Sequence, residues 1–381
     1  MQHHQLNKIA IGLTVSLALF TSVQAEVKIS GAVDYSVERF ITKTNPGAFD
    51  ASDNVVRMAS TLANYNYFSL SGKENLDGGM NATYELSLKS PDQGSFVPYL
   101  AHVGLEGGFG KLKIGSQWRP LFTAVAAIDP TQLSATPGFA GAGKSGTGLS
   151  GLAPEPNKGS ITYNLPSLMP GMFIQLQQGQ ANDEQGDNYG AHIILTDGKK
   201  FFVTYAMHNE KMLAGSIFAA SATGTNGIDS TPVFGGLTLA QLTVVGQNGL
   251  NHRLYTSAAG GETRESSGVA GSYDFGSFKL VGGKVSESVK GTDAALNMLV
   301  IGLKIPVVDK INLGYLFSQA EHTRSTGTEF SITGNKVLLT YDFSKQTSLY
   351  YAQGKQKLDG GTTAGNEFSS AISALGLRHT F

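Results

Sequence analysis

Histidines and acidic residues are the side chains most able to do catalytic or metal chemistry in this chain of 381 residues, which has no cysteine. The eight histidines are scattered, and none belongs to an H-E-x-x-H motif or a zinc-ligand spacing. No G-x-S-x-G motif or phosphate-binding loop occurs, and the glycines of Leu105–Gly110 lack the strand–helix context of a nucleotide loop. We therefore expect no enzymatic activity, no metal site and no cofactor.

One acidic run, Asp183–Asp187, offers several hard oxygen ligands of the kind that suit Ca²⁺. It lacks the full ligand pattern of a calcium loop, and we interpret it as a solvated loop tip. Cation binding is the alternative.

The overall charge is close to balance, with 28 Lys and Arg against 29 Asp and Glu. A nucleic-acid binder needs a basic stripe to neutralise phosphates, so nucleic acid is not an expected partner. Only 15% of the residues are charged, whereas glycine is abundant at 48 residues. The absence of cysteine also excludes a disulfide scaffold.

The first 25 residues read as a cleaved signal peptide. A basic residue, Lys8, precedes the apolar run Ile9–Phe20, and Val23-Gln24-Ala25 supplies small residues at the cleavage positions. The run is shorter than the ~20 residues that a membrane-spanning helix needs. We therefore predict a mature domain of residues 26–381. Because no later segment is apolar for long enough, this domain is either soluble or a closed membrane barrel.

The rest of the chain alternates between apolar and polar residues with a period of two. Met80–Lys89, Lys111–Gln117 and Lys336–Phe343 are clear examples, and helical periodicity is nearly absent. The polar faces are rich in small residues, and the apolar faces end in aromatics such as Tyr341 and Phe343. Strands that are apolar outside and polar inside, bordered by aromatic residues, are typical of transmembrane β-barrels.

The connections between these segments also alternate in length, as they do in outer-membrane barrels. Short turns are expected at Asn75–Gly78, Gly107–Gly110, Thr196–Lys199, Phe275–Ser277 and Ser344–Gln346. Longer loops are expected at Thr42–Asp53, Ala181–Asp187, Ser286–Asp293, Glu321–Ser331 and Lys355–Asn366. Sixteen strands result if Asn209–Ser266 is one long loop, and eighteen if that segment holds another hairpin; we favour sixteen.

Four short motifs resemble those of a known family. They are Gly72–Ala82 (GKENLDGGMNA), Val103–Gly115 (VGLEGGFGKLKIG), Asn157–Tyr163 (NKGSITY) and the C-terminal Gly376–Phe381 (GLRHTF). Together they are similar to the general porins of Gram-negative outer membranes, especially the proteobacterial type with Neisseria-like sequences.

The resemblance implies an all-β, 16-stranded transmembrane antiparallel barrel with an inward-folded third external loop, which would span Trp118–Asn157. It also implies a homotrimer in the outer membrane, in contact with its lipids and lipopolysaccharide. The terminal Phe381 resembles the signal read by the barrel-assembly machinery. The function implied is passive diffusion of ions and small hydrophilic solutes.

The pore residues follow from the same resemblance. Four charges of the third loop would lie at the constriction: Arg119, Asp129, Lys144 and Glu155. The family's arginine positions are occupied here by Tyr67, Ser116 and Asn164, so the opposing basic cluster is largely lost. Residues on the lumen-facing side of their strands complete the expected pore wall: Lys113, Gln117, Lys89, His102 and Arg57. With the two loop carboxylates kept, we predict weak cation preference or little selectivity.

Two alternatives to the general diffusion pore remain open. Tyr67, Tyr99 and Trp118 could form a stacking surface for sugars or aromatic solutes in a substrate-selective porin, although aromatic residues at such positions more often pack a loop. The other alternative is a secreted β-rich adhesin or binding module.

Overall fold

The computed structural model describes residues 26–44, 54–62, 66–90, 96–134, 156–182, 185–214, 217–219, 232–234, 237–238, 253–256, 260–323, 325, 327, 329–360 and 368–381. The predicted signal peptide, residues 1–25, lies outside the described residues, as do Lys144 and Glu155.

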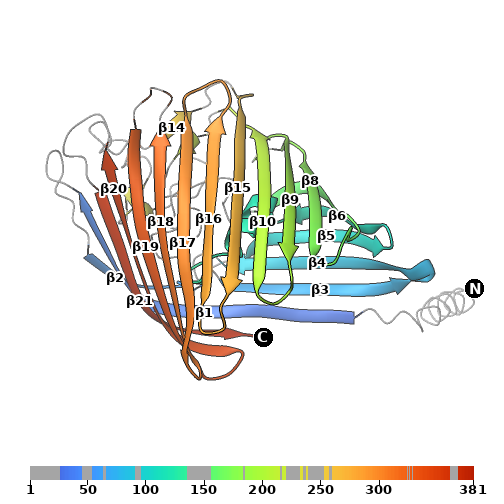
Figure 1. The fold of residues 1–381 in the computed structure, drawn as a ribbon, viewed down its shortest axis with the longest axis horizontal. Helices are drawn as coiled ribbons and strands as arrows, with labels where there is room; N and C mark the ends of the chain where they lie inside the picture. Colours follow the sequence, from blue (N-terminus) through green and yellow to red (C-terminus); the bar gives the residue numbers. More distant parts are fainter. Residues whose placement is uncertain are drawn as a thin grey trace, which may run out of the picture.

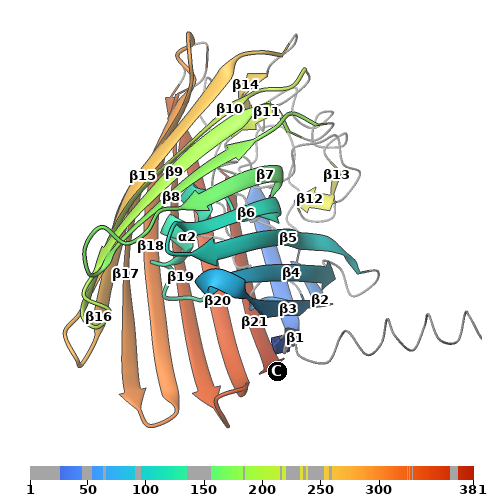
Figure 2. The same ribbon diagram turned by 90° about the vertical axis from the view of Figure 1, so that its right-hand side faces the viewer.

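Long antiparallel strands make up nearly all of the described structure (Figures 1 and 2). The first half of the main sheet contains β1 (Glu26–Thr44), β2 (Asn54–Ala59), β3 (Asn66–Leu76), β4 (Met80–Ser90), β5 (Val97–Gly107), β6 (Gly110–Gln117), β7 (Asn157–Asn164), β8 (Met172–Gly179), β9 (Asn188–Thr196) and β10 (Phe201–Lys211). The second half contains β15 (Thr263–Asp274), β16 (Lys279–Val289), β17 (Ala295–Val308), β18 (Ile311–Thr323), β19 (Glu329–Asp342), β20 (Thr347–Gly360) and β21 (Phe368–Thr380).

The sheet closes on itself because its last strand pairs with its first. β21 pairs with β1 from Ala32↔Thr380 to Thr44↔Phe368, and the backbones of Gly31 and Phe381 exchange hydrogen bonds of 2.9 and 3.1 Å. The other edge of β1 pairs with β3 along its first part and with β2 along its second. β2 and β3 are therefore two parts of one interrupted strand, and the barrel has sixteen strands, as expected from the sequence.

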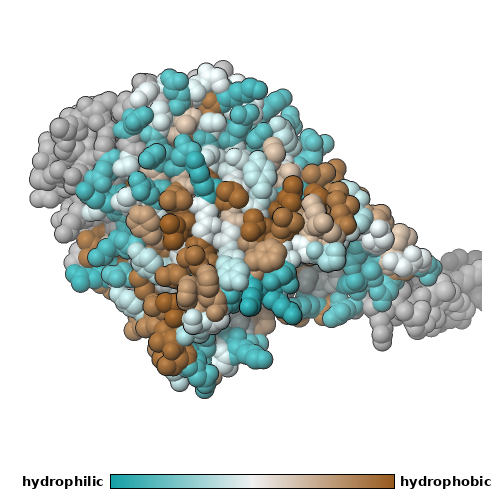
Figure 3. Space-filling view, viewed as in Figure 1, coloured by the Kyte–Doolittle hydropathy of each residue, from teal (hydrophilic) through white to brown (hydrophobic). Residues whose placement is uncertain are grey.

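The period-two pattern places apolar side chains outside the barrel. On β1, Val33, Tyr35 and Val37 are exposed, whereas the alternate residues Asp34 and Ser36 are buried inside. Figure 3 shows apolar side chains spread over the strands on one outer face. Aromatic pairs border this surface beside the short β15–β16 and β19–β20 turns, with ring centroids 5.1 Å apart for Tyr341–Phe343 and 4.7 Å apart for Tyr273–Phe275. This is the outward apolar surface that a lipid-facing barrel requires.

The short turns lie at the same end of the barrel as Phe381. Thus β3 and β4 are joined by the 3-10 turn η1 (Asp77–Gly79), and β5 and β6 by two residues. Three expected long loops are shorter than predicted, because β16 extends to Val289, β18 to Thr323 and β20 to Gly360. Polar residues there continue the strands, since a strand above the lipid band can carry polar residues on both faces.

The long segment between β10 and β15 adds no strand to the barrel. β10 pairs directly with β15, from Phe201↔Tyr273 to Lys211↔Thr263. The described parts of the intervening segment form two separate two-stranded ladders, β11 (Ile217–Ala219) with β14 (Arg253–Thr256) and β12 (Pro232–Phe234) with β13 (Leu237–Thr238). The eighteen-strand alternative is therefore wrong, and the segment outside the barrel strands is residues 212–262.

Among the described residues, no helix is both long and apolar enough to span a bilayer.

Candidate functional site

The inner wall of the barrel is apolar along one side. Inward-facing side chains on β15 to β19 form a buried cluster, whose members include Val281, Val285, Met298, Val300, Leu316 and Ile332. Such a surface would be unfavourable against an aqueous lumen, because each buried Val or Leu side chain is worth about 1.5–3 kcal/mol relative to its exposed state. Another part of the chain must therefore cover this apolar inner wall.

The segment after β6 covers this apolar wall. Its helix α2 (Pro120–Ala126) contacts β9, β10 and β15. Leu121, Ala124 and Ile128 belong to the same buried cluster as the wall residues. A Cβ atom at Gly302 or Gly314 would collide with Pro130, so glycine is required where the segment lies closest to the wall. The described part of the predicted third loop, residues 118–134, thus packs on the inner face of the barrel.

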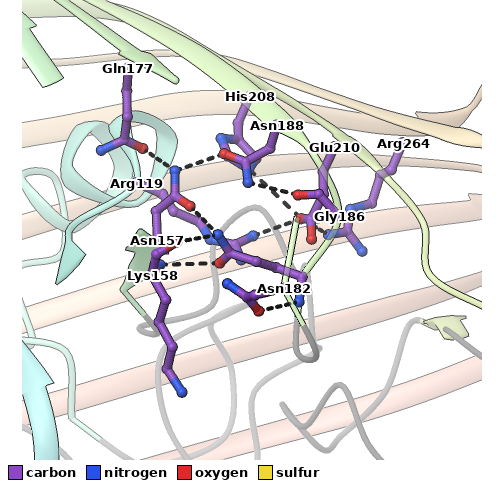
Figure 4. A network of polar contacts seen from close by, with 11 residues as sticks. Arg119, Asn157, Lys158, Gln177, Asn182, Gly186, Asn188, His208, Glu210 and Arg264 are labelled. Atoms are coloured by element: carbon purple, nitrogen blue, oxygen red, sulfur yellow. Dashed lines mark hydrogen bonds and ion pairs between the residues drawn. The ribbon is translucent and has the colours of Figure 1, made fainter. Parts of the chain in front are cut away.

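A buried charge cluster holds the base of this segment (Figure 4). Arg119 Nη1 lies 3.0 Å and Arg264 Nη2 lies 2.6 Å from the same oxygen, Oε2 of Glu210. Nε2 of the fully buried His208 is 3.8 Å from that oxygen. All three charged side chains are nearly inaccessible to solvent, so the two cations and the carboxylate interact with little screening.

An amide network fixes the far end of the same loop (Figure 4). Nδ2 of Asn157 donates to Gln177 Oε1 at 2.8 Å and to Asn188 Oδ1 at 2.7 Å. Nε2 of Gln185 donates to Asn157 Oδ1 at 2.7 Å. Gln177 Nε2 donates to the carbonyl of Trp118 at 2.9 Å, which links the end of the loop to its beginning.

A second ion pair attaches residues 129–134 to β19, at the other edge of the apolar wall from the strands that α2 contacts. Nζ of Lys336, on β19, lies 3.6 Å from Asp129 Oδ2 and donates to the carbonyl of Ser134 at 2.6 Å. Both charged side chains are fully buried. Asp129 Oδ1 also accepts hydrogen bonds from the backbone N–H and the hydroxyl of Thr131.

These contacts correct one expectation about the constriction. Arg119 and Asp129 were expected to place their charges in the lumen, but each lies in a buried ion pair at the wall. A carboxylate neutralised by Lys336 provides little field for passing ions. The predicted cation preference depended on Asp129 and on Glu155, which lies outside the described residues, so the structure removes part of its basis.

Polar and charged side chains line the other side of the lumen, along β3 to β7. Lys113 on β6 faces inward beside Glu85 and His102, whose Nε2 lies 4.0 Å from Glu85 Oε2. Towards the end with short turns, Glu106 pairs with Lys73 at 2.5 Å and with Lys111 at 3.1 Å. Glu85, Glu106, Lys111 and Lys73 all keep partial solvent exposure.

The remaining predicted wall residues occupy varied positions. Arg57 Nε donates to Glu38 at 3.0 Å, and Ser116 Oγ donates to the carbonyl of Tyr99 at 3.0 Å. Gln117 is buried and hydrogen bonds to Ser160. Tyr67 pairs with Ala32 of β1, and Asn164 ends β7 and pairs with Lys111.

The aromatic residues pack the loop. Trp118 lies edge-on to Tyr99, with 5.0 Å between centroids, and stacks on Phe122 at 4.7 Å. Tyr99 and Phe122 are buried, and Lys89 Nζ lies 4.6 Å above the Tyr99 ring. This arrangement favours the packing interpretation over a solute-stacking surface.

Sequence reasoning missed the three residues that anchor the loop: Glu210, Arg264 and Lys336. Glu210 and Arg264 fall within the segment expected to form a long loop, but they lie at facing positions on β10 and β15. The alternation of residues within its strand indicated that Lys336 faces inward. Nothing in the sequence indicated which loop residue it would meet.

No metal site is found in the described part of the chain, since it contains no group of three or more His, Asp or Glu residues placed to hold an ion. Of the acidic run, Asp187 accepts a hydrogen bond from the backbone of Ala181.

Among the short turns, the backbone N–H groups of Lys199 and Phe201 donate to Asp197 and lower the pKa of its carboxyl.

The comparisons with known proteins agree with this architecture. A family model described as Gram-negative porin matches residues 12–361. The fold is similar to that of an anion-selective porin from Comamonas acidovorans, with a TM-score of 0.67, 18% identity, and coverage of 94% of this chain and 100% of that chain. Outer-membrane expressed OmpT of Vibrio cholerae aligns with a TM-score of 0.62, 12% identity, and coverage of 95% and 99%. Salmonella typhi OmpF in complex with daunomycin aligns with a TM-score of 0.56, 14% identity, and coverage of 93% and 97%.

No curated protein sequence matches this chain. At these low identities the solved structures establish the fold alone, whereas the family match spans nearly the whole sequence. The closed sixteen-stranded barrel, its apolar outer surface and this match lead to one conclusion: the chain belongs to the Gram-negative porin family and is a channel of the outer membrane.

Proposed function

We propose that this porin conducts small hydrophilic solutes and ions by passive diffusion along the inner wall of β3 to β7. The observation that carries the proposal is the asymmetry of the lumen. One side is apolar and covered by residues 118–134, whereas the other presents partly exposed charged side chains. Water and ions pass along the polar wall, because its charged side chains can interact with them and an apolar wall cannot. No enzymatic step is part of this proposal.

The charges on that side favour a weak preference for anions. Lys73, Lys111 and Lys113 face the lumen there, against Glu85 and Glu106. Unit charges ~8 Å from a passing ion contribute about 0.5 kcal/mol at the dielectric constant of water and about 2 kcal/mol at an effective value of 20. The bias is therefore small, and it replaces the cation preference expected from the sequence.

The test is the reversal potential of purified protein in planar bilayers under a KCl gradient. We expect mild anion preference, and the variant Lys113→Glu should move the reversal potential toward cation preference. A twofold or larger change in the permeability ratio corresponds to the ~0.5 kcal/mol lower limit. Lys284→Gln is the matched control, because Lys284 lies on the outer face between Val269 and Leu299 and should leave the ratio unchanged. Marked cation selectivity of the parent would contradict the proposal.

We further propose that the channel is a homotrimer, is surrounded by outer-membrane lipids and lipopolysaccharide, and is inserted by the barrel-assembly machinery through Phe381. The backbone of Phe381 completes the β1–β21 seam, and its ring remains partly exposed beyond the last strand. Deleting Phe381 should strongly reduce assembled protein in the outer-membrane fraction, measured as heat-modifiable, detergent-resistant oligomers. Wild-type oligomer levels would count against a role for this residue.

The mature chain is proposed to begin at Glu26, after removal of residues 1–25. The support is the small-residue pattern before that position, and β1 starts at the same residue. The intact mass of protein isolated from outer membranes should equal that of residues 26–381, and a retained leader would refute cleavage there.

A further inference from the structure

The second strand of the barrel carries four extra residues at the point where it is interrupted. On β1, the partners of this strand run from Ala32 to Ser36, a distance of four positions. On the interrupted strand, the matching residues are Tyr67 and Ala59, which are eight positions apart. The interrupted strand is therefore four residues longer than the part of β1 that it faces, so these extra residues cannot all pair with β1.

The described part of this excess, Ser60–Leu62, turns to the inner side of the barrel; we call it the inset. The backbone N–H of Leu62 donates to Asp34 Oδ2 at 2.7 Å, and Ser60 Oγ donates to the carbonyl of Asp34 at 2.8 Å. Asp34 faces inward, because its neighbours Val33 and Tyr35 are exposed on the outer surface. The inset therefore lies against the lumen side of β1.

Apolar packing holds the inset in place. Leu62 forms a buried cluster with Leu338 of β19 and with Tyr350 and Ala352 of β20, all on the inner wall. The hydroxyl of Tyr350 donates to Asp34 Oδ1 at 2.7 Å, and its ring crosses Gly376 of β21, where a Cβ would collide with it. The inset is thus attached to strands on both sides of the barrel seam.

The consequence is that two carboxylates on the inner wall are hidden from the lumen. Asp34 is 1% exposed and Glu38 is 2% exposed. Thr61 Oγ1 donates to Glu38 Oε1 at 2.5 Å, and Arg57 donates to its other oxygen. Both carboxylates point inward from β1, and without the inset they would face water and passing ions.

We propose that the inset is a selectivity element, which shields Asp34 and Glu38 from the lumen and confines the permeation path to the wall of β3 to β7. This rests on the proposed function and deepens it, since shielding keeps the acidic residues on β1 from opposing the proposed anion preference. It assigns a role in conduction to a segment outside the third loop.

The test is deletion of residues 60–63 in the full-length protein. Removing four residues makes the lengths of the two paired strands equal and, because four is even, keeps every later side chain on its present face. In planar bilayers we expect higher single-channel conductance and a reversal potential shifted toward cation preference. A folded, conducting deletion variant with the parent's conductance and reversal potential would overturn the proposal.

Matched neutralisations separate shielding from pore width. Adding Asp34→Asn and Glu38→Gln to the deletion variant should return the reversal potential toward the parent value while the conductance stays high. The same two substitutions in the parent should leave its reversal potential nearly unchanged, whereas Glu85→Gln, on the open wall, should shift it toward anion preference. If the deletion variant does not assemble, the comparison of D34N/E38Q with E85Q in the parent protein decides whether the two carboxylates are shielded. A shift from D34N/E38Q as large as that from E85Q would mean that the carboxylates are not shielded.

The two proposals fail in distinguishable ways. A parent protein that conducts no ions would contradict the proposed function itself. A parent that conducts with anion preference, together with a deletion variant of unchanged selectivity, would contradict only the role of the inset.

Discussion

Replacing Glu210 with glutamine is expected to destabilise the folded barrel by about 3–5 kcal/mol, the usual cost of removing one partner from a buried ion pair. Oε2 of Glu210 lies 3.0 Å from Arg119 and 2.6 Å from Arg264, and both guanidinium groups are buried. The substitution keeps the side-chain size but leaves two cations close together in a poorly solvated site. Urea unfolding of the detergent-solubilised protein should show the loss as a lower midpoint.

The same substitution should also affect conduction, because Arg119 stands at the base of the segment that covers the apolar wall. We expect larger fluctuations of the open-channel current. Glu321→Gln is the control, since Glu321 is exposed on the outer face of β18 and should change the midpoint little. A Glu210→Gln protein as stable as this control would show that the cluster does not anchor the loop.

Replacing Lys336 with methionine is the second change with a large expected effect. Methionine preserves the length of the side chain but leaves the fully buried Asp129 without its cation and the carbonyl of Ser134 without its donor. A loss of about 3–5 kcal/mol is again expected for an uncompensated buried charge. The measurement is the urea midpoint, together with single-channel recordings, in which partial closures should become frequent as residues 129–134 detach.

A double-mutant cycle tests whether the effect belongs to the pair. Asp129→Asn alone should also destabilise the protein, because it leaves Lys336 buried without its anion. The double variant Lys336→Met/Asp129→Asn should recover part of the loss, since no charge then remains unpaired. Additive losses in the double variant would indicate that the two side chains act independently.

Much of the fold could be predicted because the residue pattern within each strand indicates that it is a strand and which of its side chains face inward. Alternation in segments such as Met80–Lys89 assigns every side chain to the inner or outer face. Short turn segments such as Gly107–Gly110 fix which strands are neighbours, and direct pairing of β10 with β15 settles the strand count at sixteen. Boundaries were less predictable, because the polar ends of β16 and β18 have the same composition as loops.

The candidate site was predictable only in part. The inward direction of Lys113, Lys89 and Arg57 followed from strand parity. Their neighbours did not, because the placement of Lys113 near Glu85 and His102 depends on the register between strands. The environment of the loop charges could not be predicted, since a sequence shows that Arg119 and Asp129 are charged but not which residues they pair with.

The sequence by itself predicted a barrel with an apolar outer face from local periodicity, and a Gram-negative outer-membrane porin from motifs that resemble a known family. Only the tertiary structure decided which charged side chains are neutralised in buried ion pairs and which face the lumen. Asp129 meets Lys336, and Thr61 meets Glu38, across distances in the chain that no local pattern spans. The physical reason is that closing a barrel brings remote strands and inserted segments together, and the electrostatics of a pore depend on those encounters.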